Sequence, residues 1–278
     1  MMIAKIADIV KSFAEKSEFS KEPLAAGRGY RYNGSVIFTE EGTLSVFAEY
    51  RFQTELHAHS SPASPCGDFP PEEVVRRYAA LGYDSLVLCN HFHCGLPDHA
   101  DEQAFLSRHY DDYERAVKAA EGTGLTVIYG CEIRFARENN NDYLLFGIDP
   151  SYAEEAYDYL EGGIADFSKA FRRKDRLLIQ AHPFRKGMEP VDPALLDGIE
   201  SFNLHPGHNS AVGIAARYAA EKDFTVTCGT DFHHDGHEGV CGVLSKTKMN
   251  DSHDLQALLR SRDYLFRIGG SLVLPYGA

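Results

Sequence analysis

Two histidines separated by one residue, His57 and His59, are the first pattern in the chain that could bind a metal ion. They end the short run Thr54–His59, which passes from apolar to polar residues. In a β-strand, side chains two positions apart share one face, so both imidazoles could reach one ion. By itself an H-x-H pattern also fits surface or hydrogen-bonded core histidines. The other metal-binding residue types in the chain therefore decide its meaning.

Further residues of these types stand directly after short apolar runs, in five separate units of the chain. Parallel strands of a barrel open their carboxyl ends on one face, and that face holds the active site. Residues far apart in the sequence are therefore expected to meet in one ring. The predicted metal ligands are His57, His59, His91, Glu132, His182, Asp231 and His233.

The size and chemistry of this set predict two or three divalent ions. One zinc-like ion takes about four protein ligands, or three and a water, and Glu132 and Asp231 can each bridge two ions through their two oxygens. Mixed imidazole and carboxylate donors suit zinc, manganese or iron better than calcium or magnesium. A hydroxide that bridges such ions is a nucleophile at neutral pH.

The elements that must position these residues alternate between short β-rich runs and helical patterns. Helices are predicted over 71–81, 101–121, 152–173 and 209–221, and strands over 85–89, 125–129, 143–146, 176–180, 199–203 and 224–227. The alternation predicts an α/β fold in which parallel strands are joined by crossovers. Six or seven such units favour a closed barrel over an open sheet.

Residues 1–50 are predicted to form an appendage to a barrel domain over 51–278. Apolar residues at helical spacing predict an amphipathic helix over 2–16. Two apolar runs, 36–38 and 44–47, flank an acidic turn and predict a β-hairpin.

The composition is that of an ordinary globular protein, with 44% hydrophobic and 25% charged residues among 278. The net charge of −13 disfavours long nucleic acid and favours a small substrate. No apolar stretch is long enough to cross a bilayer, and the N-terminal residues lack the pattern of a signal peptide. Six cysteines without a C-x-x-C pair indicate reduced thiols. We therefore expect a cytoplasmic protein without a membrane partner, of undetermined oligomeric state.

Five motifs resemble, in the same order, those of the PHP (polymerase and histidinol phosphatase) family of metal-dependent phosphoesterases. They span residues 54 to about 245: His57-x-His59, Asn90-His91, Gly130-Cys131-Glu132-Ile133, Ala181-His182-Pro183-Phe184 and Gly229-Thr230-Asp231-Phe232-His233. The resemblance implies a distorted (β/α)7 TIM-like barrel that hydrolyses phosphoesters at a two- or three-metal centre. It also implies three ligand sets: His57, His59, Glu132 and Asp231 for one ion, Glu132 and His182 for a second, and His91 with His233 for a third.

The chain departs from the family pattern at two points. Asn90 stands where the family often has aspartate. The loop after the H-x-H motif offers Ser64, Cys66 or Asp68 where an acid or histidine is frequent. Cys66 is either a thiolate ligand or an inert buried thiol, and we favour the inert thiol. Members with three well-held metals also tend to have a histidine between the glutamate and the H-P motif, whereas none lies between Glu132 and His182.

Three further residues are candidates for substrate handling. Arg134 and Arg185 stand close in sequence to predicted ligands, where a guanidinium could hold a phosphate through two hydrogen bonds. Each could equally form a surface salt bridge. His205 follows a strand end, together with His208, and could protonate a leaving group or line the pocket.

Three functions follow from these residues. The first is a phosphoesterase for a small phosphomonoester or a nucleotide-type phosphoester, with attack of a metal-bridging hydroxide on phosphorus. The second is a metal-dependent amidohydrolase that cleaves a C–N bond. The third is a non-catalytic PHP module, which predicts missing ligands, and this chain keeps nearly all of them.

Overall fold

The computed structural model describes residues 30–32, 35–38 and 48–276. The chain divides into two units, residues 1–51 and 52–278. In the first unit, β1 (Tyr30–Tyr32) pairs antiparallel with β2 (Ser35–Phe38). The expected helix over 2–16 and the expected strand at 44–47 lie outside the described residues. The link between β1 and β2 has the sequence Asn-Gly, the strongest short hairpin signal. The described partner strand of β2 therefore precedes β2 in the chain, whereas the predicted hairpin pairs 36–38 with 44–47.

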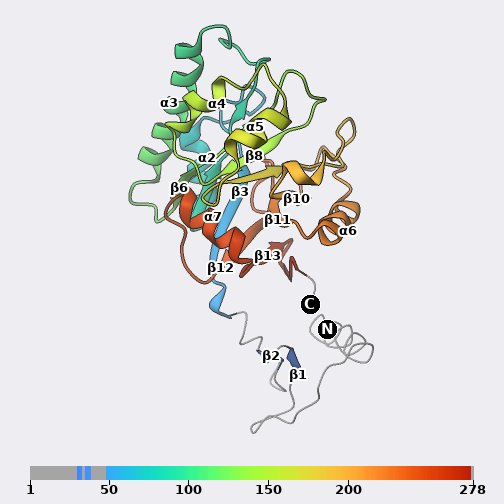
Figure 1. The fold of residues 1–278 in the computed structure, drawn as a ribbon. Helices are drawn as coiled ribbons and strands as arrows, with labels where there is room; N and C mark the ends of the chain where they lie inside the picture. Colours follow the sequence, from blue (N-terminus) through green and yellow to red (C-terminus); the bar gives the residue numbers. More distant parts are fainter. Residues whose placement is uncertain (1–29, 33–34, 39–47, 277–278) are drawn as a thin grey trace. The chain divides into compact units, whose positions relative to one another are not determined.

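The second unit contains two six-stranded sheets (Figure 1). The first has the order β14 (Ser271–Val273), β13 (Leu265–Ile268), β12 (Cys241–Ser245), β3 (Phe52–Ala58), β4 (Ser85–Leu88) and β6 (Thr126–Tyr129). The second has the order β11 (Thr225–Gly229), β10 (Gly198–Asn203), β9 (Leu177–Gln180), β8 (Tyr143–Phe146), β7 (Cys131–Ile133) and β5 (His91–Phe92).

Helices connect these strands and cover them. The described helices are α2 (Pro71–Ala80), α3 (Glu102–Ala120), α4 (Tyr152–Tyr157), α5 (Ile164–Phe171), α6 (Val212–Lys222) and α7 (Ser252–Ser261). Pro71 and two acids occupy the first turn of α2, as its sequence predicts. The expected helical region 152–173 is two helices separated by residues 158–163, and Gly162 and Gly163 stand directly before α5.

The α/β class is confirmed, but the described strands form no closed barrel. The two sheets meet through one parallel bridge between Ala58 and Phe232. On the other side the chain passes directly from β4 to β5 and from β6 to β7, so these short segments carry it from one sheet into the other.

The expectation of parallel strands throughout is wrong at β8, which is antiparallel to both β7 and β9. No helix is described between β7 and β8, and residues 134–142 are too few for the crossover that a parallel neighbour needs. The C-terminal strand β12 is also antiparallel to its neighbour β3. β3 nevertheless lies parallel to β4, and β9 lies parallel to β10 and β10 to β11, so the ends that carry the predicted ligands open on a common side.

No helix in the described part of the chain combines the length and the apolar character that a bilayer span needs.

Candidate metal centre

The structure brings all seven predicted ligands together. His57 lies near the end of β3 and His59 directly after it, His91 and Glu132 lie on the short strands β5 and β7, and the other three follow β9 and β11. Six of the seven residues are buried, and His91 is partly exposed, with 15% of its side chain accessible.

Glu132 occupies the middle of this group, and its two carboxylate oxygens face different histidines. Oε1 lies 3.3 Å from Nε2 of His57 and 3.3 Å from Nε2 of His182. Oε2 lies 2.7 Å from Nδ1 of His91 and 3.6 Å from Nε2 of His59. A carboxylate with one oxygen toward each of two histidine pairs has the geometry of a bridging ligand.

Asp231 faces the same histidines from the opposite strand end. Its Oδ1 lies 3.4 Å from Nε2 of His59 and 3.7 Å from Nε2 of His57, and Oδ2 lies 3.9 Å from Nε2 of His182. The ligand atoms of His57, His59 and Asp231 all lie within 4.8 Å of one another, as do those of His59, His91 and His233.

Hydrogen bonds at Nδ1 orient four of the histidines. Nδ1 of His57 donates to Glu200 Oε1 at 3.0 Å, and Nδ1 of His59 lies 3.1 Å from the hydroxyl of Ser64. His233 uses Nδ1 toward the backbone oxygen of Asp231 at 2.8 Å, and His182 uses it toward the sulfur of Met188 at 2.9 Å. We assign the proton of each ring to Nδ1, which leaves the lone pair of Nε2 for an ion.

The site fits divalent ions because its buried donor atoms have no hydrogen-bond partners. Nε2 of His57 and His59, Nδ1 of His91 and both oxygens of Glu132 are buried, and none of them has a hydrogen bond of good geometry within the described part of the chain, although His91 Nδ1 lies 2.7 Å from Glu132 Oε2. Such groups are costly when left unpaired. Converging imidazole and carboxylate donors of this kind are the ligands of zinc, manganese and iron.

Two of the ligands have backbone conformations that non-glycine residues rarely adopt. The φ angle is +29° at His182 and +51° at Asp231. Positive φ at such residues costs free energy and occurs mainly where the surrounding structure requires a particular side-chain direction. Here His182 points toward Glu132, and Asp231 points toward His57 and His59.

Glu200 on β10 is the main residue that the sequence analysis missed. Besides His57, its carboxylate accepts hydrogen bonds from the backbone N–H of His182 at 3.2 Å and from Nδ2 of Asn203 at 3.0 Å. Asn203 also lies 3.3 Å from Asp231. Glu200 is the charged residue of the strand Gly198–Asn203, and a charge within a predicted strand is the sequence signal that points to it.

Glu55 lies on β3, and its carboxyl group holds two strand ends of the site together. Its Oε1 accepts the backbone N–H groups of His57 and Thr230, each at 3.0 Å, and its Oε2 accepts the hydroxyl of Tyr78 at 3.2 Å. Complete burial raises the pKa of Glu55 to about 7. The carboxyl group therefore joins the two strand ends that carry His57 and Asp231.

Asn90, the residue that replaces the family's usual aspartate, fastens the loop after His59. Its Oδ1 accepts the backbone N–H of Ser60 at 2.7 Å and the hydroxyl of Ser64 at 3.0 Å. Ser64 also accepts the backbone N–H of His91 at 2.9 Å. A neutral amide therefore serves as an anchor of this loop.

Cys66 is exposed, so the expectation of a buried thiol is wrong. Its thiol interacts with the imidazoles of His91 and His233. Although partial burial alone raises it, hydrogen bonds from these two histidines lower the pKa of Cys66 to about 6. A sulfur with this environment can become a thiolate at neutral pH, which leaves open its role as a ligand.

A cavity of about 290 Å³ opens above the ligands. The three residues predicted to handle substrate, Arg134, Arg185 and His205, all line it, and His208 lies beside them. Arg134 is bound to Asp142 through two hydrogen bonds of 2.6 and 2.8 Å, so the alternative of a salt bridge holds for this residue. Among the described residues, the guanidinium of Arg185 has neither a hydrogen bond nor an ion pair.

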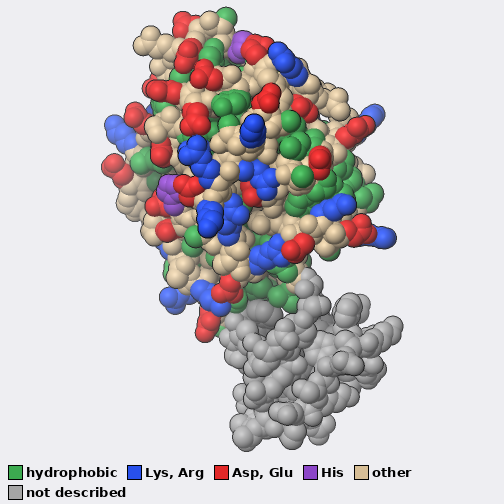
Figure 2. Space-filling view, viewed as in Figure 1, with side chains coloured by type: hydrophobic (Ala, Val, Ile, Leu, Met, Phe, Trp, Pro, Cys, Tyr) green, Lys and Arg blue, Asp and Glu red, His purple; other side chains and the backbone are tan. Residues whose placement is uncertain are grey.

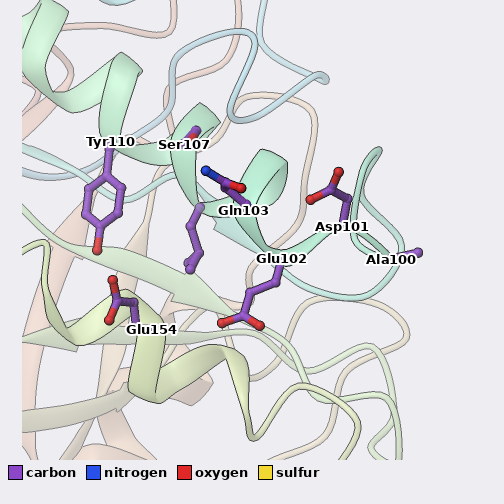
Figure 3. Close-up of a pocket in the computed structure, with 8 residues that line it drawn as sticks. Ala100, Asp101, Glu102, Gln103, Ser107, Tyr110 and Glu154 are labelled. Atoms are coloured by element: carbon purple, nitrogen blue, oxygen red, sulfur yellow. The ribbon is translucent and has the colours of Figure 1, made fainter.

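A larger hollow of about 710 Å³ lies elsewhere, along α3 and α4 (Figure 3). Its lining includes the carboxylates of Asp101, Glu102 and Glu154 and no arginine or lysine. Figure 3 shows Tyr110 of α3 pointing toward Glu154 of α4. This hollow contains none of the seven ligands, and its negative charge would repel a phosphate.

A model of the PHP domain family matches residues 55–237. The chain belongs to the PHP family. The match begins just before the H-x-H motif and ends after His233, so it includes every predicted metal ligand.

Two solved structures show the same fold as this PHP chain. One is a two-domain protein from Bacteroides vulgatus that contains a predicted PHP-like metal-dependent phosphoesterase; it is 17% identical with a TM-score of 0.54, over 81% of this chain and 67% of that one. The other is PsfC from Pseudomonas syringae, 14% identical with a TM-score of 0.51, over 74% of this chain and 88% of that one. No curated protein matches the sequence.

Membership of the PHP family and the converging donor groups support a metal-dependent hydrolase. The PHP fold explains why residues as distant as His57 and Asp231 meet, because both strands end on the same side of the molecule.

Proposed function

We propose that this PHP domain is a phosphoesterase that hydrolyses a small phosphomonoester or a nucleotide-type phosphoester. One observation carries the proposal. The metal-ligand atoms of His57, His59, His91 and Glu132 that lack a hydrogen bond lie next to a cavity, and the same cavity is lined by Arg185, whose guanidinium has no partner among the described residues. Metal ligands and a free guanidinium side by side suit a substrate group with several negative oxygens.

His57, His59, Glu132 and Asp231 would hold one ion, Glu132 and His182 a second, and His91 with His233 a third. Cys66, whose thiol interacts with His91 and His233, would be a further donor for the third. Bound ions would supply a hydroxide nucleophile at neutral pH and would neutralise charge on the phosphoryl oxygens.

Arg185 is the residue that we expect to bind the phosphate directly. Arg134 has two of its donors committed to Asp142, so it contributes positive charge and a wall of the pocket rather than a free bidentate clamp. The structure therefore gives Arg134 and Arg185 different surroundings, although both stand close in sequence to predicted ligands.

His205 and His208 would line the leaving-group side of the cavity. Their rings stack with centroids 3.9 Å apart, and Nδ1 of His208 is buried, has no hydrogen bond and lies 3.9 Å from Asp231 Oδ2. Burial lowers the pKa of both rings to about 4. Neutral imidazoles suit hydrogen bonding to a substrate hydroxyl, so we assign them to substrate binding rather than to protonation of a leaving group.

The size of the cavity and the surface charge favour a small substrate. About 290 Å³ accommodates a phosphorylated metabolite or a single nucleotide. On the face in Figure 2, basic and acidic side chains are interspersed, without the continuous basic band that a long nucleic acid requires.

Hydrolysis of p-nitrophenyl phosphate by the full chain tests the proposal. Protein stripped with a chelator should be inactive, and reconstitution with Zn²⁺, Mn²⁺ or Fe²⁺ should restore phosphate release. A panel of phosphorylated metabolites then identifies the substrate class.

The same preparation distinguishes the two alternatives. Cleavage of amide or cyclic ureide substrates without phosphate release would support an amidohydrolase. Metal binding without turnover of either class would support a non-catalytic PHP module. Either result would contradict the phosphoesterase proposal.

A further inference from the structure

Three metal-binding residue types meet at a second place, outside the candidate metal centre. Cys94 and His99 lie in the loop between β5 and α3, and Glu161 lies in the connection between α4 and α5. Their ligand atoms all lie within 4.8 Å of one another. We call these three residues the loop cluster. The proposed hydrolysis uses none of them.

The contacts within the loop cluster place all three donors around one point. Nε2 of His99 lies 3.2 Å from Oε1 of Glu161. The thiol of Cys94 lies within 4.8 Å of ligand atoms of both residues. Cys94 and His99 are partly buried, whereas the side chain of Glu161 is 72% exposed, so the point is open to solvent on one side.

The backbone around Glu161 is held by contacts that do not involve the donors. The carbonyl of Leu160 accepts the N–H of Ala136 at 2.8 Å, and the carbonyl of Gly162 accepts the N–H of Arg137 at 3.1 Å. Both neighbours of Glu161 are therefore fixed to the segment that follows β7.

The loop that carries Cys94 and His99 is fixed in a similar way. The hydroxyl of Tyr157 on α4 donates to the carbonyl of His99 at 2.5 Å. Arg108 on α3 donates to Asp98 at 3.0 Å and to the carbonyl of Pro97 at 2.7 Å. The donors are thus preorganised by neighbouring elements, and preorganisation lowers the entropic cost of binding an ion.

We propose that the loop cluster binds a zinc-class divalent ion through the Cys94 thiolate, the His99 imidazole and the Glu161 carboxylate. Each of the three is a common zinc ligand, and a water completes a tetrahedral set. A thiolate donor disfavours magnesium and calcium, which prefer oxygen ligands. Ion binding releases the thiol proton of Cys94 to solvent, as for other cysteine ligands.

The surroundings of the loop cluster favour a cation. Asp101 and Glu102, at the start of α3, line the neighbouring acidic hollow shown in Figure 3. The hydroxyl of Tyr157, which donates to the carbonyl of His99, has a raised pKa because of desolvation and of nearby charges that include Glu102 and Glu161. A surface ion pair such as that between His99 and Glu161 contributes little to the free energy of unfolding by itself.

An ion at the loop cluster would join two parts of the fold. It would tie the loop 93–101, which begins two residues after the ligand His91, to the connection between α4 and α5. The site is therefore expected to brace the rim of the catalytic face without taking part in hydrolysis.

Cobalt substitution in the full chain tests this site through a readout other than activity. Co²⁺ bound by a thiolate has a sulfur-to-metal charge-transfer absorption in the near ultraviolet. Because Cys66 lies beside the candidate metal centre and could give the same band, the measurement uses the Cys66→Ser variant as the parent protein. We expect the absorption when Co²⁺ is added to metal-free Cys66→Ser, and its loss in the double variant Cys66→Ser/Cys94→Ser. Absence from Cys66→Ser, or retention in the double variant, would overturn the proposal.

Alkylation provides a second measurement, because it reports on Cys94 in a folded wild-type chain. Zn²⁺ should slow modification of Cys94 by iodoacetamide, read by mass spectrometry of the Cys94 peptide, at least about tenfold. This protection should disappear in His99→Ala and in Glu161→Gln. Equal rates with and without Zn²⁺ in the wild type, or full protection in both variants, would contradict the site. Neither experiment depends on the phosphoesterase proposal.

Discussion

The Nδ1 atom of His57 lies 3.0 Å from Oε1 of Glu200, and both side chains are fully buried. The carboxylate keeps the proton on Nδ1 and turns Nε2 toward Glu132 and Asp231. A carboxylate that accepts a hydrogen bond from one ring nitrogen commonly orients a metal-binding histidine and raises the basicity of the other ring nitrogen. Glu200 is therefore a positioning residue for the candidate metal centre.

Glu200→Gln should weaken metal binding about 10- to 100-fold, because the amide keeps the size but loses the charge that orients His57. Competition with a chromophoric chelator measures the affinity for Zn²⁺. The exposed Glu114→Gln is the matched control and should retain wild-type affinity. Unchanged affinity in Glu200→Gln would show that the hydrogen bond has no such role.

His57→Ala and Asp231→Ala should each lose bound metal and hydrolytic activity while the fold is retained. Each change removes one predicted metal ligand, since His57 faces Glu132 and Asp231 faces His57 and His59. Metal content and circular dichroism, measured on the same samples, check the two parts of this expectation. The exposed His253→Ala should behave as wild type. Full metal content with full activity in either variant would refute the ligand assignment.

Gly229→Ala should damage the site although residue 229 carries no donor. A Cβ atom there would overlap Cβ of His57 and would lie 2.7 Å from Oε1 of Glu200. We expect lower metal affinity and lower thermal stability. Gly213→Ala, in the first turn of α6, is the control, because a Cβ atom there would meet nothing within 4 Å. Equal behaviour of the two variants would contradict the packing argument.

Arg185→Ala should raise KM for p-nitrophenyl phosphate about tenfold or more and leave metal content unchanged. Hydrogen bonds to a charged group contribute about 1.5–3 kcal/mol. Steady-state kinetics measures the change, with the exposed neighbour Lys186→Ala as the control. A KM that stays at the wild-type value in Arg185→Ala would remove this residue from the phosphate site.

Metal affinity should rise with pH. In the metal-free chain, burial alone lowers the pKa of His91, but the charge of the Glu132 carboxylate raises it to about 10. Burial also lowers the pKa of His233, but hydrogen bonds to Asp231 and Cys66 raise it to about 9. Both rings are therefore protonated at pH 7, and an ion must displace those protons. The apparent dissociation constant for Zn²⁺ should fall steadily between pH 6 and about pH 9. Equal affinity across this range would show that these histidines do not bind the ion.

Much of the fold is predictable because its signals are local. Helix α2 begins at Pro71 and α3 ends near Gly122, where residue types alone mark the ends. The direction of β8 is not local, because it depends on how its nine-residue connection turns, and the short strands β5 and β7 are continuations of β4 and β6 that an apolar pattern does not separate. The pairing of β12 with β3 joins segments about 190 residues apart, beyond the reach of any periodicity.

The sequence by itself determined which residue types could bind metal and that they stand at strand ends, since strand alternation and the order of the five motifs are properties of the chain. Only the tertiary structure decided their partners. It places Glu200 against His57 across 143 positions and commits Arg134 to Asp142, whereas the guanidinium of Arg185 has no hydrogen bond or ion pair among the described residues. The physical reason is that the role of a polar side chain depends on which hydrogen-bond donors and acceptors lie within a few ångströms of it. That neighbourhood exists only after the strands have assembled.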